Sequence, residues 1–317
     1  MTTMRHCCII GGTGFIGSHL VKQLLERNRR LTVIGRNPHP SRTLPPGVDY
    51  LAGDYGDSYF LKGVLQGVDE VVSLAYSTVP KSSFEDPVHD ILSNLPASVK
   101  LFEIAADLAI EKLVFVSSGG TVYGKAQALP IAEEHPTNPI SAYGITKLAT
   151  EKYAQMFHEL KELPVMCVRP ANAYGEGQKP FTGQGFIATA IAAILERQEV
   201  VLFGETGTIR DYIHVTDVAS GVVAVLEHGN PGHCYNIGSG IGRSNRDILD
   251  ALVPLANAAG LDVKTTTLSS RRFDVPANVL DCQKLRQMTG WKTSVSFDVG
   301  IRDAWDWFLH FYNNKTL

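Results

Sequence analysis

The chain has 317 residues, of which 44% are hydrophobic and 19% charged, and its formal net charge is −3. This composition suits a globular protein with a sizeable core, and the charge excludes bulk attraction to nucleic acid or to an anionic membrane. No apolar run is long enough to span a bilayer and the first residues lead directly into a predicted strand, so we expect a cytoplasmic protein without a signal peptide. The five cysteines lack zinc-ligand spacing, and we expect reduced thiols and no bound metal.

The first predicted elements are a buried strand, a glycine turn and a helix. The apolar run at 7–10 leads into the sequence IIGGTGFIG at 9–17, and residues 18–27 place apolar side chains on one helical face. Glycines let backbone N–H groups approach a pyrophosphate, and the helix N-terminus offers a positive dipole end. The segment therefore predicts a dinucleotide cradle. Its predicted contact residues are Gly11, Thr13, Gly14, Phe15, Ile16 and Gly17.

Strands and helices alternate through the first half of the chain. Strands are predicted at 31–34, 50–51, 70–74, 112–117 and 165–169, with helices at 97–108 and 143–160 among others. Such alternation predicts a parallel sheet covered on both faces. From about Tyr174 the elements become shorter, with a strand at 200–203, a helix at 215–226 and a strand at 234–237. We predict an α/β fold, a doubly wound parallel sheet of the Rossmann type with a smaller C-terminal substrate-binding lobe. The first domain is residues 1–173, and residues 174–317 form mainly the second, with some segments returning to the sheet.

The end of the second strand bears on the choice of dinucleotide. The sequence LTVIGRN at 31–37 holds no acid, and none follows before Asp49. An acid at this strand end would accept a hydrogen bond from the ribose 2′-hydroxyl of NAD. Gly35 leaves space instead, and Arg36 can pair with a 2′-phosphate. The sequence favours NADP(H), with NAD(H) held by other contacts as the alternative.

A tyrosine and a lysine stand four residues apart in the segment SAYGITK at 141–147. On a helix Tyr143 and Lys147 share one face. An ammonium beside a phenol lowers the phenol pKa from its usual value of about 10. Tyr143 could then move a proton on or off an alcohol while hydride moves to or from a nicotinamide, with both residues also contacting the cofactor. The alternative is a chance surface pair.

Further motifs follow in order along the chain: SSGGTVYG at 117–124, RPANAYG at 169–175, RDYIHVTDVA at 210–219 and YNIGSG at 235–240. With the cradle and the Tyr–Lys pair, they make nearly the whole chain resemble the extended short-chain dehydrogenase/reductases that modify nucleotide sugars. That group includes 4-epimerases, 4,6-dehydratases and 4-ketoreductases.

The resemblance implies a nucleotide-sugar substrate whose phosphates are bound by Asn172, Arg210 and Arg272, with Arg271 able to replace Arg272. Arginine suits a diphosphate because it is always charged and offers paired donors. The resemblance also places Asp54 at the adenine, Ala75 at the cofactor and Thr78 at the sugar. It implies that Asn94 steadies the sheet near the nicotinamide, although Asn94 could equally cap a helix starting near Pro96. A homodimer is implied, with helices 97–108 and 143–160 as its candidate interface, although the apolar stripes of both helices could equally be core.

The chain departs from this family at Gly119, where the catalytic Ser or Thr is expected. We predict that Thr121 replaces the missing hydroxyl, because residues two apart lie on the same side of an extended chain. Ser118 is the alternative if the chain kinks at the two glycines.

Three reactions share this apparatus. Dehydratases have an Asp-Glu pair where this chain has Gly120 and Thr121, which disfavours dehydration. The Gly35-Arg36 pair favours an NADPH-dependent reductase of a nucleotide-diphosphate 4-keto-6-deoxyhexose, in surface polysaccharide or deoxysugar biosynthesis. The alternative is a nucleotide-diphosphate-hexose 4-epimerase with retained NAD. A non-catalytic dinucleotide-binding regulator is a minor alternative.

Overall fold

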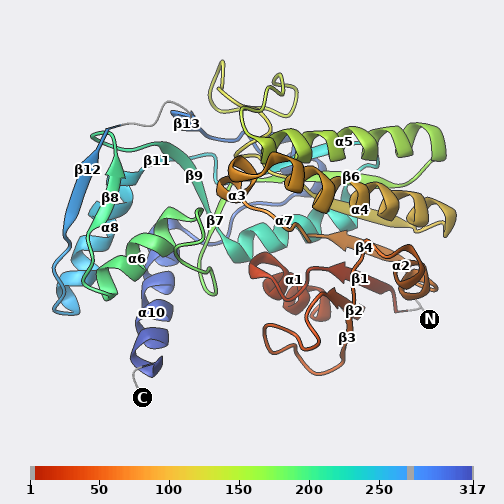
Figure 1. The fold of residues 1–317 in the computed structure, drawn as a ribbon, viewed down its shortest axis with the longest axis horizontal. Helices are drawn as coiled ribbons and strands as arrows, with labels where there is room; N and C mark the ends of the chain where they lie inside the picture. The colour runs from red at the N-terminus through yellow and green to blue at the C-terminus, as the bar shows by residue number, and fades with distance from the viewer. Residues whose placement is uncertain (1–3, 270–274, 316–317) are drawn as a thin grey trace.

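The computed structural model describes residues 4–269 and 275–315, which form a larger and a smaller lobe side by side (Figure 1). The larger lobe is built on a seven-stranded sheet in the order β10-β6-β5-β4-β1-β2-β3, with every neighbouring pair parallel. Its strands are β1 (His6–Ile10), β2 (Arg30–Gly35), β3 (Val48–Ala52), β4 (Glu70–Ser73), β5 (Lys112–Val116), β6 (Val165–Pro170) and β10 (Cys234–Ile237). This is the doubly wound sheet that the sequence predicts.

Helices cover both faces of this sheet. One face carries α1 (Phe15–Leu25) and α7 (Val215–His228), and the other carries α2 (Ser58–Leu65), α4 (Pro87–Asp107) and α5 (Ala142–Lys161). Alternate strand residues divide between the two cores: Ile9 packs with Leu24 of α1, whereas Ile10 packs with Phe102 of α4. Because successive side chains of a strand point to opposite faces, a sheet covered twice needs the unbroken apolar runs found here.

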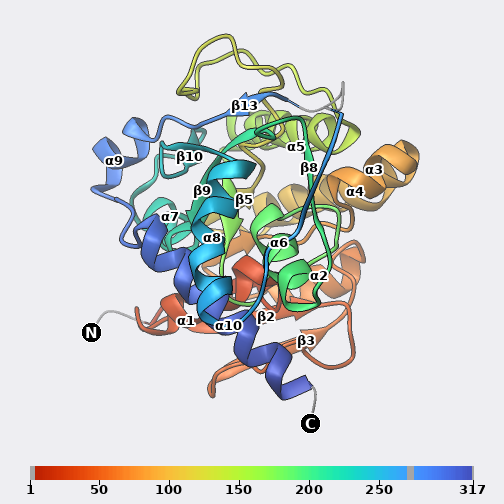
Figure 2. The ribbon, with the colours of Figure 1, turned by 90° about the vertical axis from the view of Figure 1, so that its left-hand side faces the viewer.

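The smaller lobe is assembled from short elements late in the chain. They are β7 (Asn172–Tyr174), α6 (Phe186–Leu195), β8 (Val200–Phe203), β9 (Ile209–His214), β11 (Gly242–Ser244), α8 (Asn245–Ala258), β12 (Thr265–Leu268), β13 (Ala277–Asn278) and α10 (Phe297–Lys315). Strand β9 pairs with β7, β11 and β13, while β12 pairs with β8. Figure 2 shows α6, α8 and α10 gathered beside these strands. The short helices α3 (Pro80–Glu85) and α9 (Gln283–Thr289) belong to the connections.

Helix α4 differs from its prediction. It begins at Pro87 rather than near residue 97, because the Asp86 side chain caps it by accepting a hydrogen bond from the His89 N–H at 2.9 Å. Pro96 lies inside the helix, where it removes one backbone donor without ending it. Asn94 therefore lies within α4 and is fully buried, so the interpretation of Asn94 as a helix cap is wrong.

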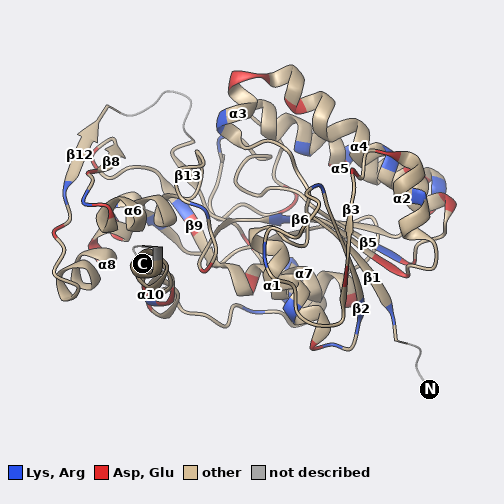
Figure 3. Cartoon of the chain, turned by 60° about the horizontal axis from the view of Figure 1, so that its bottom comes forward, with Lys and Arg blue, Asp and Glu red and all other residues tan. Residues whose placement is uncertain are grey.

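Charged residues of both signs are interspersed over the outer helices, as Figure 3 shows for α2, α4 and α5. Within residues 4–269 and 275–315, no helix is long and apolar enough to cross a membrane. The same residues contain no group of three or more His, Cys, Asp or Glu side chains arranged to hold a metal ion.

Candidate active site

The glycine turn between β1 and α1 forms a close-packed cradle. A Cβ added at Gly17 would lie 2.7 Å from the Gly12 Cα, which is too close. Gly11 has a φ of +86°, and a Cβ added there would lie 3.0 Å from the Ala75 backbone nitrogen. Gly14 is exposed at the N-cap of α1, where no side chain bonds to the first helical amides. These uncapped N–H groups fit a dinucleotide pyrophosphate, because they leave donors and a positive helix end open to an anion.

The expectation that Gly35 leaves space at the end of β2 is wrong, because the Tyr50 side chain occupies it. A Cβ added at Gly35 would lie 2.6 Å from the Tyr50 hydroxyl, which itself donates to the Asn37 carbonyl at 2.6 Å. Arg36 is exposed and its Nη1 lies 3.4 Å from the Ser77 Oγ, so it points toward the loop that follows β4. Asp54 is exposed after β3, and its Oδ1 accepts from the Gly56 N–H.

Arg42 is a residue near the cradle that the sequence analysis missed. Its Nη1 donates to the Ser18 Oγ of α1 at 3.1 Å, and its Nη2 donates to the Gly177 carbonyl of the smaller lobe. The neighbouring Ser41 Oγ donates to the Thr13 carbonyl at 3.3 Å. Only these contacts identify Arg42, because in the sequence it is one cation in a polar loop.

Tyr143 and Lys147 meet on the first turns of α5, as their spacing predicts. The helix start is fixed by two serines, since Ser141 Oγ accepts from the Gly144 N–H at 3.1 Å and Ser83 Oγ accepts from the Tyr143 N–H at 3.2 Å. Lys147 is buried, and its Nζ donates to the Val116 carbonyl at the end of β5 at 2.8 Å. The Nζ lies 3.9 Å from the centroid of the Tyr76 ring and 5.8 Å from that of Tyr143.

The electrostatics of this pair differ from the expectation. Burial lowers the pKa of Lys147 to about 7, against the opposing charges of Glu151 and Asp90. Burial and then Asp90 raise the pKa of Tyr143 above that of an ordinary phenol. The expectation that Lys147 lowers the Tyr143 pKa is therefore wrong for this arrangement, because the ammonium is directed at Val116 and Tyr76.

Residues 118–122 form a turn instead of continuing β5. The Val122 N–H donates to the Ser118 carbonyl at 3.2 Å, so the alternation argument that favours Thr121 over Ser118 does not apply. The Thr121 Oγ1 is buried without a hydrogen-bond partner among the described residues. The Thr121 carbonyl oxygen packs against Gly144, the residue after Tyr143, and a Cβ added at Gly144 would lie 2.8 Å from this oxygen. Ser118 is half-buried, and which hydroxyl serves the reaction stays a prediction.

Gly119 faces the protein interior. A Cβ at this position would lie 2.5 Å from the Leu280 Cδ1 and 2.8 Å from the Arg169 carbonyl oxygen. A Cβ at Gly120 would instead lie 3.4 Å from the Asn172 Oδ1, an ordinary contact. The missing hydroxyl therefore reflects a turn geometry that has no room for a side chain at Gly119.

The predicted substrate residues are only partly brought together. Asn172 begins β7 and lies beside Gly120 in the turn after β5. Strand β7 pairs with β9, which carries Arg210. The Arg210 Nη1 donates to the Ile209 carbonyl at 2.8 Å. Thr78 is buried and its hydroxyl donates to Asp90, so the structure engages it inside the protein rather than presenting it to a sugar. Arg272 and its neighbour Arg271 lie outside the described residues.

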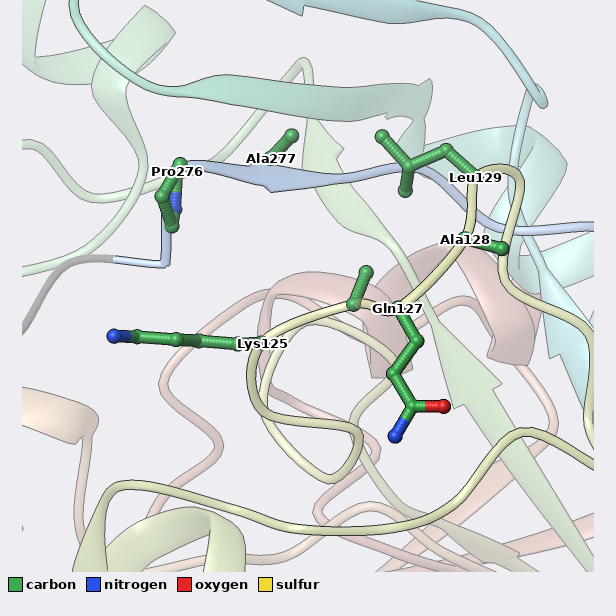
Figure 4. Close-up of a pocket in the computed structure, with 7 residues that line it drawn as sticks. Lys125, Gln127, Ala128, Leu129, Pro276 and Ala277 are labelled. Carbon is green, nitrogen blue, oxygen red and sulfur yellow. The ribbon is translucent and has the colours of Figure 1, made fainter.

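A surface hollow of about 440 Å³ lies between the loop 125–129 and the start of β13 (Figure 4). Lys125 supplies a cation among its lining residues, which also include Leu129 and Pro276. The loop follows the motif at 117–124, which contains the turn, but neither Tyr143 nor Lys147 lines the hollow.

The strand order, the glycine cradle and the Tyr–Lys pair together define an oxidoreductase fold of the short-chain dehydrogenase type. The sequence pattern of the NAD dependent epimerase/dehydratase family matches residues 7–238, and the chain belongs to this family. The prediction of a nucleotide-sugar-modifying enzyme with a dinucleotide-binding fold is thus confirmed at the level of the family.

Similar proteins extend over nearly the whole chain. A UDP-glucose 4-epimerase of Mycolicibacterium smegmatis is 31% identical over 97% of this chain and 98% of its own length. The solved structure of a UDP-glucose 4-epimerase with UDP-glucose from Thermotoga maritima has a TM-score of 0.91 at 28% identity, covering 97% of this chain and 99% of that one. The complex of the Thermus thermophilus UDP-glucose 4-epimerase with NAD has a TM-score of 0.87 at 32% identity, covering 96% and 99%.

Restoring the family hydroxyl by Gly119→Ser is expected to destabilise the protein without improving turnover. The added side chain meets Leu280 and a backbone carbonyl, an overpacking that costs about 1–3 kcal/mol of unfolding free energy. Gly120→Ser is the matched control, since its Cβ has room, and it is expected to change the unfolding free energy less. Urea unfolding measures both, and a Gly119→Ser protein as stable as the parent would contradict the turn geometry.

Proposed function

We propose that the protein is a 4-epimerase of a nucleotide-diphosphate hexose. The observation behind this proposal is a Tyr143–Lys147 pair at the carboxyl end of β5, in a chain that aligns from end to end with UDP-glucose 4-epimerases. These relatives favour the epimerase alternative over the 4-ketoreductase that the sequence alone favours.

The cradle between β1 and α1 would hold a nicotinamide dinucleotide, which would supply the hydride chemistry at sugar C4 when bound. Tyr143 would take the proton of the C4 hydroxyl and give it back, which is ordinary acid–base catalysis by a phenol. Lys147, on the same face of α5, would contact the dinucleotide. Asn172 and Arg210 would bind the diphosphate from the side of the smaller lobe, by charge-assisted hydrogen bonds.

Dehydration is disfavoured by the turn after β5. Removing water from the sugar requires a further acid and base beside the reacting carbons. Gly120 and Thr121 hold the two places where dehydratases have carboxyl groups, and neither can donate or accept a proton at neutral pH. The turn therefore supports a reaction confined to C4.

A second candidate is the NADPH-dependent 4-ketoreductase, favoured by the end of β2. No acid stands at this strand end to accept the ribose hydroxyl of NAD, and Arg36 is exposed. A guanidinium pairs well with a 2′-phosphate. This strand end supports NADP(H), whereas the Thermus thermophilus relative is a complex with NAD.

The nucleotide in the purified protein separates the two candidates. A retained dinucleotide that survives gel filtration is expected for the epimerase, and exchangeable NADPH for the reductase. Arg36→Ala is expected to narrow any preference for NADP(H) over NAD(H) by about 1–3 kcal/mol, measured by calorimetry on nucleotide-stripped protein. Arg30→Ala, an exposed arginine at the opposite end of the same strand, is the control. Retained NAD, together with an unchanged nucleotide preference in Arg36→Ala, would contradict the reductase candidate.

Removing the phenolic hydroxyl tests the acid–base role. Tyr143→Phe is expected to lower kcat for epimerisation of a UDP-hexose roughly 10²- to 10⁴-fold with little effect on substrate binding. Tyr153→Phe, on the same helix but exposed, should leave kcat unchanged. Equal turnover by Tyr143→Phe and the parent would contradict the assignment, and absence of turnover by the parent with every nucleotide sugar would favour the regulator.

We also propose that two copies of the chain associate through α4 and α5. These helices pack together and expose apolar side chains, among them Leu92, which is 67% exposed, and Leu160, which is 73% exposed. A hollow of about 250 Å³ lies between them and is lined by Met156 and Ala106. Exposed apolar side chains on two packed helices favour a protein interface.

Leu92→Glu is expected to weaken this homodimer, because it would bury a carboxylate in the interface. Sedimentation velocity at micromolar concentration should show a dimer for the parent and a shift toward monomer for the variant. Leu268→Glu, at an exposed leucine on β12 of the other lobe, should leave the dimer intact. A monomeric parent would rule out the association.

A further inference from the structure

Asp90 is a fully buried acid on the first turn of α4. Its Oδ1 accepts a hydrogen bond from the Thr78 hydroxyl, while its Oδ2 has no hydrogen-bond partner among residues 4–269 and 275–315. Within those residues its carboxyl group forms no ion pair. A buried carboxyl group in this state is costly unless an opposite charge lies near it.

A polar network holds Asp90 against the loop that follows β4. The Asn94 Nδ2 donates to the Thr78 Oγ1 at 3.2 Å and to the Asp90 carbonyl at 2.8 Å, and the Asn94 Oδ1 accepts from the Ser77 N–H at 2.7 Å. Asn94 thus joins α4 to the segment that carries Tyr76.

Tyr76 links Asp90 to the catalytic pair. Its ring packs edge-on against Tyr143 with centroids 4.9 Å apart, and the Lys147 ammonium lies 3.9 Å above its face. An ammonium over an aromatic face is a favourable cation–π contact, and it is stronger when desolvated. Asp90 acts electrostatically on all three groups and raises the pKa of each.

Other charged and titratable groups also face Lys147. Glu151 lies one turn further along α5, and Cys167 lies on β6. Glu151 is bound by Arg169, whose Nη2 and Nε donate to it at 2.6 and 3.0 Å. Glu151 raises the Lys147 pKa more than Asp90 does, but it is paired with Arg169, so Asp90 is the nearby carboxyl group without a cation of its own among the described residues.

We propose that Asp90 is a positioning residue that sets the charge of the Tyr143–Lys147 pair, as a buried counter-charge that favours the protonated form of Lys147. This rests on the proposed function only in taking Tyr143 and Lys147 as the reacting pair. Removing a negative charge favours the deprotonated form of every group near it. Without Asp90 the pKa values of Tyr143 and Lys147 both fall, and both limbs of the pH profile for turnover move to lower pH.

The test measures the titration of Lys147 in the full-length protein. NMR titration of ¹³C-lysine-labelled protein, with Lys147→Met to assign its signal, gives the Lys147 pKa in the parent and in Asp90→Asn. We expect the Asp90→Asn value to lie about one unit below that of the parent. The kcat profile should shift in the same direction on both limbs. Asp86→Asn is the matched control, because it removes an exposed acid from the start of the same helix, keeps a capping oxygen, and should leave the Lys147 titration unchanged.

A Lys147 titration unmoved by Asp90→Asn would overturn the proposal, whatever happens to activity. If Asp90→Asn does not fold, Asp90→Leu removes both the charge and the buried oxygens that need partners, and the same titration applies. A shifted Lys147 titration in a protein whose turnover is independent of Tyr143 would instead overturn the proposed function and leave the role of Asp90 standing.

Discussion

Lys147 lies buried at the carboxyl end of β5, where its Nζ donates to the Val116 carbonyl. Burying an ammonium is costly, and its pKa of about 7 is a measure of that cost. This cost is offset by the Val116 carbonyl, the face of the Tyr76 ring and the carboxyl groups of Asp90 and Glu151. These groups come from β5, the loop after β4, α4 and α5, so the placement of one charge ties together the elements that surround the site.

The parallel sheet explains why these elements meet. Every strand of the larger lobe runs in the same direction, so the turns that follow them lie along one edge. The cradle follows β1, Arg36 follows β2, Tyr76 follows β4, the glycine turn follows β5 and Asn172 follows β6. The smaller lobe is attached at this edge through β7 and β9, which brings its polar side chains to the same place.

The sheet and the cradle could be predicted from sequence because their signals are local: apolar runs, glycine spacing and a helical i, i+4 pair. Other features depend on distant contacts. Tyr50 closes the space at Gly35 from the neighbouring strand, and Leu280 and Arg169 close the space at Gly119 from far along the chain. Asp90 follows a proline near a helix start, where an acid is ordinary, and only the packing of α4 shows that it is buried.

The loop after β2 bears on how a cofactor would be held. Through Arg42 it bonds to Ser18 of α1 and to the Gly177 carbonyl of the smaller lobe, and His19 of α1 lies 3.1 Å from the Glu176 carbonyl. These contacts tie α1 and the loop after β2 to the smaller lobe beside the cradle. Arg42 and His19 therefore hold the two lobes in a fixed relation, as transfer of hydride between a cofactor on one lobe and a sugar on the other would require.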